Sequence, residues 1–189
     1  SAGEISKLRR RNAGLAAAAT GDVAAMRAAF AAGAFDPADD ADPHGSGALH
    51  WAAGGGHQAA CEWLVDAQNV LVNATRRKDG RAPLHWAARN GRLETCAWLV
   101  SRGADANAAT YDGDTPFNLA VWRGHDDVAR FFVSIGGVDP RRTNRWGCNA
   151  LLWACTRTRE EDANVGGVEG SHPGSVLGTV AWLVDALGV

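Results

Sequence analysis

A short block of apolar and aromatic residues returns four times along this chain at a nearly constant interval. The second residues of successive blocks lie 35, 33 and 34 positions apart. Chance rarely produces so even a spacing, and intervals of this length indicate an array of repeated structural units. The four blocks occupy residues 48–53 (ALHWAA), 83–88 (PLHWAA), 116–121 (PFNLAV) and 150–155 (ALLWAC).

A second apolar block follows the first in each unit, and glycines lie between the two at Gly56, Gly91 and Gly124. The pattern predicts a turn, a helix, a tight glycine turn, a second helix and a loop. Neither helix can bury its apolar face alone, so consecutive units must stack into a solenoid. The second blocks occupy residues 61–65 (CEWLV), 96–100 (CAWLV), 129–133 (ARFFV) and 180–184 (VAWLV).

The residues of these units resemble ankyrin repeats. The resemblance is carried by residues 79–91 (DGRAPLHWAARNG) followed by 103–108 (GADANA), and by residues 112–117 (DGDTPF) with Gly124-His125. It is strong over residues 42–155 and weaker over 176–189. It implies an all-α fold: an ankyrin-repeat solenoid of stacked helix-turn-helix units joined by β-turn fingers.

We expect residues 1–189 to form a single ankyrin-repeat domain. The N-terminal unit keeps the helix pair but lacks the Thr-Pro-Leu-His block, so we interpret it as a degenerate capping repeat. The predicted units are 12–41 (the capping repeat), 42–76, 77–109, 110–142 and 143–189, the last with an inserted loop at about 156–175.

The stretch ALHWAAGGGH at residues 48–57, with Cys61 nearby, has the composition of a metal or catalytic site. His50 recurs one unit later as His85, however, and Cys61 recurs as Cys96. Equivalent side chains of stacked helices lie roughly 10 Å apart, too far for a shared metal at ~2 Å or for a disulfide. The ankyrin resemblance implies that this histidine hydrogen-bonds the backbone of a loop.

The sequence gives even less support to a zinc site or a phosphate-binding loop. Cys148, Cys155 and His172 supply three possible zinc ligands, but a structural zinc site needs four and usually a closer cysteine pair. Residues 54–56 are not a phosphate loop, because no Lys-Ser/Thr follows them. We predict no catalytic residue, no metal, no cofactor and no small-molecule substrate, and hence that the chain is not an enzyme.

Function is then expected on the surface. The ankyrin resemblance implies a concave face built from the finger tips and the exposed side of the first helices. The candidate partner-binding residues on the finger tips are Lys78, Arg81, Tyr111, Asp112, Asn144 and Arg145, and those on the first helices are Arg89, Asn90, Trp122 and Arg123.

Trp122 is the most informative candidate. The equivalent positions of neighbouring units hold Gly54 and Arg89, so packing does not require an aromatic residue there. An exposed tryptophan beside arginines has the composition of an interface hot spot. The alternative is a tryptophan lying flat on its own repeat, with only its rim in water. By pattern, the tryptophans within the two blocks belong to the core or to its edge.

Charge is unevenly distributed although the net charge is only −2. Basic residues gather at 76–78, 81, 141–142 and 145, and acidic ones at 36–42. This polarity serves either solubility or the binding of an acidic segment of another protein. The small net charge argues against nucleic acid as the partner, and no apolar run approaches the ~18 residues of a transmembrane helix.

The last unit departs from the spacing. Phe131 and Trp182 lie 51 residues apart against a usual 33, which indicates an insertion over about 156–175. Such insertions project as loops, often from a binding face, but a merely tolerated flexible loop explains the spacing equally well. The final residues 183–189 are apolar without a polar cap, so we expect this edge to be covered by further chain or by a partner.

These features predict a non-enzymatic protein–protein interaction module, a scaffold or accessory subunit of a larger assembly that binds through its concave face and the inserted loop. The alternatives are a transient signalling adaptor and an RNA- or ribosome-associated protein that uses the basic fingers. Four widely spaced cysteines favour a reducing, intracellular compartment. Residues 144–153 also resemble ankyrin proteins of algae and related protists, which leaves a chloroplast or mitochondrion open.

Overall fold

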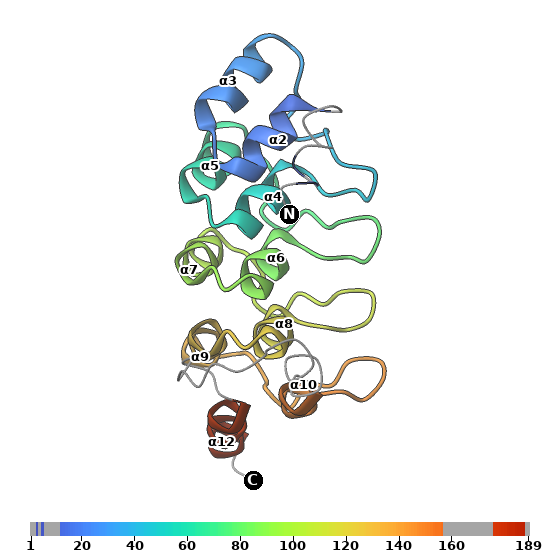
Figure 1. Cartoon of the computed structure of the whole chain (residues 1–189), viewed down its shortest axis with the longest axis vertical. Coiled ribbons are helices and arrows are strands. Elements are labelled where there is room, and N and C mark those ends of the chain that lie inside the picture. The colour runs from blue at the N-terminus through green and yellow to red at the C-terminus, as the bar shows by residue number, and fades with distance from the viewer. Residues whose placement is uncertain (1–2, 4, 6–11, 157–175, 188–189) are drawn as a thin grey trace.

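The computed structural model describes Gly3, Ile5 and residues 12–156 and 176–187, and within them the helices form two parallel stacks (Figure 1). The first helices of the units make one stack and the second helices the other, while the fingers project together to one side. Apart from one isolated β-bridge between Ala41 and Gly47, every regular element of these residues is helical. The predicted all-α solenoid is confirmed.

The first helices are α2 (Ala13–Thr20), α4 (Ala48–Gly55), α6 (Pro83–Arg89), α8 (Pro116–Arg123) and α10 (Ala150–Thr156). The second helices are α3 (Val23–Ala31), α5 (Gln58–Glu62), α7 (Leu93–Ser101), α9 (Asp126–Ser134) and α12 (Val176–Leu187). α5 continues directly into a π-helical turn, η1 (Trp63–Ala67). The exact boundaries between units stay a prediction.

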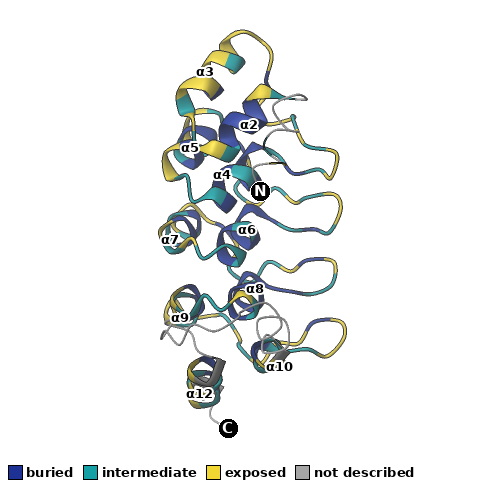
Figure 2. Cartoon of the chain, in the orientation of Figure 1, coloured by how far each residue is buried: buried dark blue, intermediate teal, exposed yellow. Residues whose placement is uncertain are grey.

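Small residues let the first helices pack closely. The alanine pairs of α4 and α6 are fully buried, and a methyl group is the only side chain that leaves neighbouring helix backbones near contact. The second helices supply bulk instead, because one large apolar residue of each lies fully inside. Figure 2 shows the resulting pattern, with a buried first stack and exposed finger tips. Four such large residues are Leu64, Leu99, Phe132 and Leu183.

Glycine ends the first helices because the backbone turns through a left-handed conformation there. Gly56, Gly91 and Gly124 have φ of +79°, +67° and +74°, a region that side-chain-bearing residues avoid. At Gly91 a Cβ would also lie 2.6 Å from the ring of His125. Each of these first helices therefore stops at the same point, and the second helix returns along the same path in each unit.

Histidine links each central unit to the next finger. The Nδ1 atom of His50 accepts the backbone N–H of Gly47 at 3.3 Å, so Nε2 carries the proton and donates to the carbonyl of Arg81 at 3.0 Å. His85 does the same with Ala82 at 3.1 Å and Asp114 at 3.2 Å. The prediction that this histidine hydrogen-bonds the backbone of a loop is confirmed.

Asn118 occupies the equivalent position in α8 and lacks the reach of a histidine ring. It is buried, and its amide Nδ2 has no hydrogen-bond partner among the described residues. By analogy with the other units, the carbonyl it would meet is that of Cys148, which accepts the finger-closing N–H of Asn144 at 2.9 Å. Within the described residues, the junction between α8 and the last finger therefore lacks a bond that the two preceding junctions have.

The fingers are also joined to one another through backbone hydrogen bonds. The N–H of Tyr111 donates to the carbonyl of Asp79, and the N–H of Arg145 donates to that of Asp112, both at 2.9 Å. Asn144 is buried between two fingers, where its Nδ2 donates to Asp114 at 2.9 Å. The finger tips thus form one continuous edge.

Acid is expected to weaken the fold through His85. Burial lowers the pKa of this ring from 6.5 to about 4, so below pH 6.5 the unfolded chain binds a proton that the folded chain excludes. The stabilisation is complete above pH 6.5 and is lost as the pH falls toward 4. Between pH 7 and pH 5 it should account for about 2 kcal/mol of unfolding free energy.

Urea unfolding at the two pH values measures this contribution. His85→Gln should be less stable at pH 7 but should lose about 2 kcal/mol less than the wild type on acidification. His44→Gln is the matched control, because His44 is exposed, and it should keep the wild-type pH dependence. Equal pH dependence in His85→Gln and the wild type would contradict the assignment.

Asn118→His should stabilise the chain. The new ring can accept the N–H of Thr115 and donate to the carbonyl of Cys148, as His85 does one unit earlier. One added hydrogen bond and one fewer unpaired buried donor should raise the free energy of unfolding by about 1 kcal/mol. Thermal melts compare it with Asn118→Gln, which has no ring; a lower melting temperature for the histidine variant would disprove the proposed geometry.

Candidate functional site

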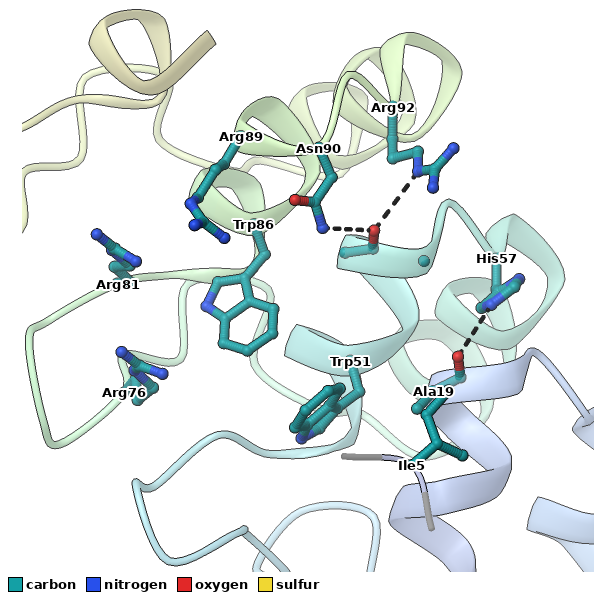
Figure 3. Close-up of a pocket in the computed structure, with 12 residues that line it drawn as sticks. Ile5, Ala19, Trp51, His57, Arg76, Arg81, Trp86, Arg89, Asn90 and Arg92 are labelled. Carbon is teal, nitrogen blue, oxygen red and sulfur yellow. Dashed lines mark hydrogen bonds between the residues drawn. The ribbon is translucent and has the colours of Figure 1, made fainter. Parts of the chain in front are cut away.

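A pocket of about 630 Å³ opens where α4, α6 and the finger before α6 meet (Figure 3). We call it the Trp–Arg pocket after its principal lining residues. Trp51 and Trp86 come from equivalent positions of two first helices, and Arg76, Arg81, Arg89 and Asn90 come from the finger and the end of α6. The principal lining residues are Trp51, Trp86, Arg76, Arg81, Arg89 and Asn90.

The two tryptophans form the floor of the pocket. Their rings meet edge to face, with centroids 5.2 Å apart and planes at 63°. The guanidinium of Arg76 lies over Trp86 at 5.5 Å from the ring centroid. Both indoles are only half-buried, so part of each ring faces the pocket. Such a surface offers apolar contact at little cost in conformational entropy.

One carboxylate, Asp79, pairs with two of the arginines. Asp79 accepts hydrogen bonds from Nε and Nη2 of Arg76, and its Oδ2 lies 3.4 Å from Nε of Arg81. Partial burial acts to raise the pKa of Asp79, but the hydrogen bonds from Arg76 and from the backbone of Arg81 outweigh it and lower the pKa overall. The carboxylate is therefore ionised at neutral pH, and its one charge is shared between two cations.

The pocket presents donors without matching acceptors. The indole Nε1 atoms of Trp51 and Trp86 are buried and make no hydrogen bond to the described residues, and the buried Nε of Arg81 has only its ion pair with Asp79 at 3.4 Å. No aspartate or glutamate is among the described residues that line the pocket. Unpaired buried donors are uncommon in native proteins and call for a partner.

Gly54 and Asn90 join the two first helices at the pocket. The Asn90 amide donates to the carbonyl of Gly54 at 2.9 Å, which ties the end of α6 to α4. A Cβ at Gly54 would lie 3.0 Å from the Trp86 ring and 3.3 Å from the Asn90 amide. The missing side chain at this position therefore makes room for both residues.

Trp122 lies farther along the same face and differs from both expectations for it. It is half-buried rather than exposed, and it packs edge to face on Trp153 of the next first helix at 5.8 Å. Arg89 and Arg123 lie over its ring at 5.8 Å and 5.5 Å. It thus bridges three units instead of lying on its own repeat.

The finger tips carry a second group of candidates, separate from the pocket. Lys78 and Tyr111 are exposed. Asp112 and Arg145 form an ion pair at 3.0 Å, and Arg145 also covers the ring of Trp146 at 4.4 Å. Trp146, which the sequence pattern did not single out as a site, is 58% exposed.

Asn144 is a correction to the predicted surface. Its amide donates to Asp114, and its Oδ1 accepts the N–H groups of Trp146 and Cys148 at 3.0 Å. These bonds hold the last finger in shape and leave the side chain only 5% exposed. We therefore remove it from the binding surface.

The structure brings three predicted residues, Arg81, Arg89 and Asn90, together in one pocket. It also assigns Trp51 and Trp86 to that pocket, although their pattern suggested the core or its edge. A usable signal was present in the sequence: two tryptophans at equivalent positions in adjacent units, with a glycine three residues after the first.

The described residues hold no cluster of three or more histidine, cysteine or carboxylate side chains suited to a metal. Cys61 and Cys96 are free and buried, and burial raises the pKa of each thiol to about 12, so neither forms a thiolate at neutral pH. Residues 157–175 of the predicted insertion lie outside the described part. No helix in the described part is both long and apolar enough to cross a membrane.

Comparison with known families agrees with this architecture. The family model for ankyrin repeats in three copies matches residues 14–110, and the model for a single ankyrin repeat matches residues 112–145. No curated protein matches the chain. Because the two matches together cover well over half of its length, the chain belongs to the ankyrin-repeat family, whose repeats are generally protein–protein interaction modules.

Proposed function

We propose that the chain is a non-enzymatic scaffold or accessory subunit that holds another protein on the face formed by its first helices and fingers. The observation that carries the proposal is a row of tryptophans and arginines along this face. Trp51, Trp86, Trp122 and Trp153 come one each from α4, α6, α8 and α10. Tryptophan and arginine are the residues most enriched at interface hot spots.

Trp122 supplies the aromatic residue that α8 lacks at the repeated position. In α8 the position equivalent to Trp86 holds Leu119, and Trp122 lies three residues later, on the same side of the helix. Its ring then reaches Trp153. A rigid aromatic row across four units suits a partner segment that runs along the solenoid rather than into a single cleft.

Exposed apolar groups favour a lasting assembly over a transient adaptor. Tyr111 is 65% exposed at one finger tip and Trp146 58% exposed at the next, and Leu152 is 46% exposed on α10. Permanent interfaces are more apolar than transient ones. An acidic partner segment fits the arginines of the row, and the free state of all four cysteines fits a reducing, intracellular compartment.

RNA binding through the basic fingers receives less support. Arg145 is paired with Asp112, and Arg76 with Asp79, so part of the basic charge counted in the sequence is neutralised locally. With a net charge of −2, little long-range attraction to a phosphate backbone remains. The same pairs serve to stiffen the fingers.

The native size of the chain in a gentle extract of its source cells tests the subunit role. We expect it to migrate well above its own 19.8 kDa and to keep its partners at raised salt, because apolar contacts are not screened. Mass spectrometry identifies the co-migrating proteins. Migration as a monomer would disprove the subunit role and leave the transient adaptor.

Variants at the finger tips test the binding face. Tyr111→Ala combined with Trp146→Ala should weaken binding of the identified partner about tenfold or more, measured by titration of purified proteins. Leu71→Ala is the matched control, since Leu71 is 75% exposed in the loop after η1 and away from the tips. Equal affinity for the double variant and the control would exclude the fingers from the interface.

A further inference from the structure

We infer that the Trp–Arg pocket holds a carboxylate side chain of the partner, with an adjacent apolar side chain of the same segment seated on Trp51 and Trp86. The inference rests on the proposed protein-binding function and deepens it, because it names the chemistry of the segment that this pocket selects. On this inference, the pocket between α4 and α6 determines which partner segments the face binds.

The first argument is the balance of donors and acceptors. Arginine side chains line the pocket, and no aspartate or glutamate is among the described residues that line it. A carboxylate has acceptor oxygens and no donor, so it can satisfy such groups without adding an unpaired one. A neutral amide or hydroxyl also accepts hydrogen bonds but adds a donor of its own and brings no charge, and a basic side chain offers no acceptor.

The second argument is charge. The finger places Arg76 and Arg81 in the pocket lining, and the one carboxylate beside them, Asp79, is not among the described lining residues. Arg76 takes both oxygens of Asp79 and its side chain is only 12% exposed, whereas the side chain of Arg81 is 27% exposed. Arg81 is therefore the cation that a second carboxylate can approach, and an arginine fork binds a carboxylate with two parallel hydrogen bonds.

The third argument is the arrangement around Trp86. Figure 3 shows its indole at the centre of the pocket, with Arg76 and Arg81 on the finger side and Arg89 toward the end of α6. An acidic group bound at Arg81 brings its neighbouring side chain over the two rings. The pocket thus recognises an acidic and an apolar side chain as a pair.

A nucleic acid fits this arrangement less well. Unspecific binding of single strands needs open aromatic faces on which bases stack. Here Trp51 and Trp86 cover each other edge to face, and Arg76 lies over the Trp86 ring. The remaining aromatic surface suits a single apolar side chain.

Selection from a random peptide library displayed on phage tests the inference even while the partner is unidentified. The wild-type chain should enrich peptides in which aspartate or glutamate lies next to an aromatic or aliphatic residue. A synthetic peptide of the enriched sequence should lose about tenfold in affinity with Arg81→Gln. Arg81→Lys should fall between the two, because it keeps the charge and loses the fork.

Arg27→Gln is the matched control, since it removes the same charge from an exposed position on α3, and its affinity should stay within about twofold of the wild type. Thermal melts establish that each variant is folded. Enriched peptides without acidic residues, or unchanged affinity in Arg81→Gln, would overturn the inference while leaving the finger-tip interface standing.

Two further outcomes count against the pocket assignment. A labelled oligothymidylate that binds more tightly than the peptide, and that Arg81→Gln releases, would assign the pocket to nucleic acid. If no peptide class is enriched and the finger-tip variants also leave the native complex intact, both the inference and the proposed face fail together.

Discussion

The hydrogen bond from a first-helix histidine to the next finger is the interaction on which the proposed binding face depends. His50 donates to the carbonyl of Arg81 and thereby fixes the finger residue whose guanidinium lines the pocket. His125 donates to the carbonyl of Arg89, at the opposite wall, at 3.1 Å. The histidines therefore hold in register the backbone from which both arginines project.

Pairing of charges decides which part of that face is available to a partner. Acidic residues of the N-terminal finger are engaged in turns: Asp42 accepts the N–H groups of His44 and Ser46, and Asp36 accepts that of Ala38. These bonds give the acidic stretch a structural role in the turns of this finger. The basic fingers differ from one another, since Arg145 has its own carboxylate whereas Arg76 and Arg81 share one. Charge counted along the sequence cannot distinguish these cases.

Much of the fold could be predicted from the sequence, because each unit repeats the same local signals. The glycine turns and the alanine pairs each have one dominant structural explanation. The site was harder to predict. The burial of Asn144 depends on Asp114, thirty residues earlier in the neighbouring finger, and the half-burial of Trp122 depends on Trp153. Contacts between units decide these side chains, and a pattern within one unit does not contain them.

The pocket itself arises from a departure from regularity. One equivalent position of α4, α6 and α8 holds Gly54, Arg89 and Trp122. It lies three residues after Trp51, Trp86 and Leu119, respectively. Glycine there leaves the space that the Trp86 ring and the Asn90 amide occupy, since a Cβ would approach them to 3.0 and 3.3 Å. Arginine one unit later supplies charge, and tryptophan after that supplies apolar surface. Identical residues at this position would give a uniform groove. The differences instead give the proposed binding face a direction, from the Trp–Arg pocket at α4 and α6 toward an aromatic surface at α8 and α10.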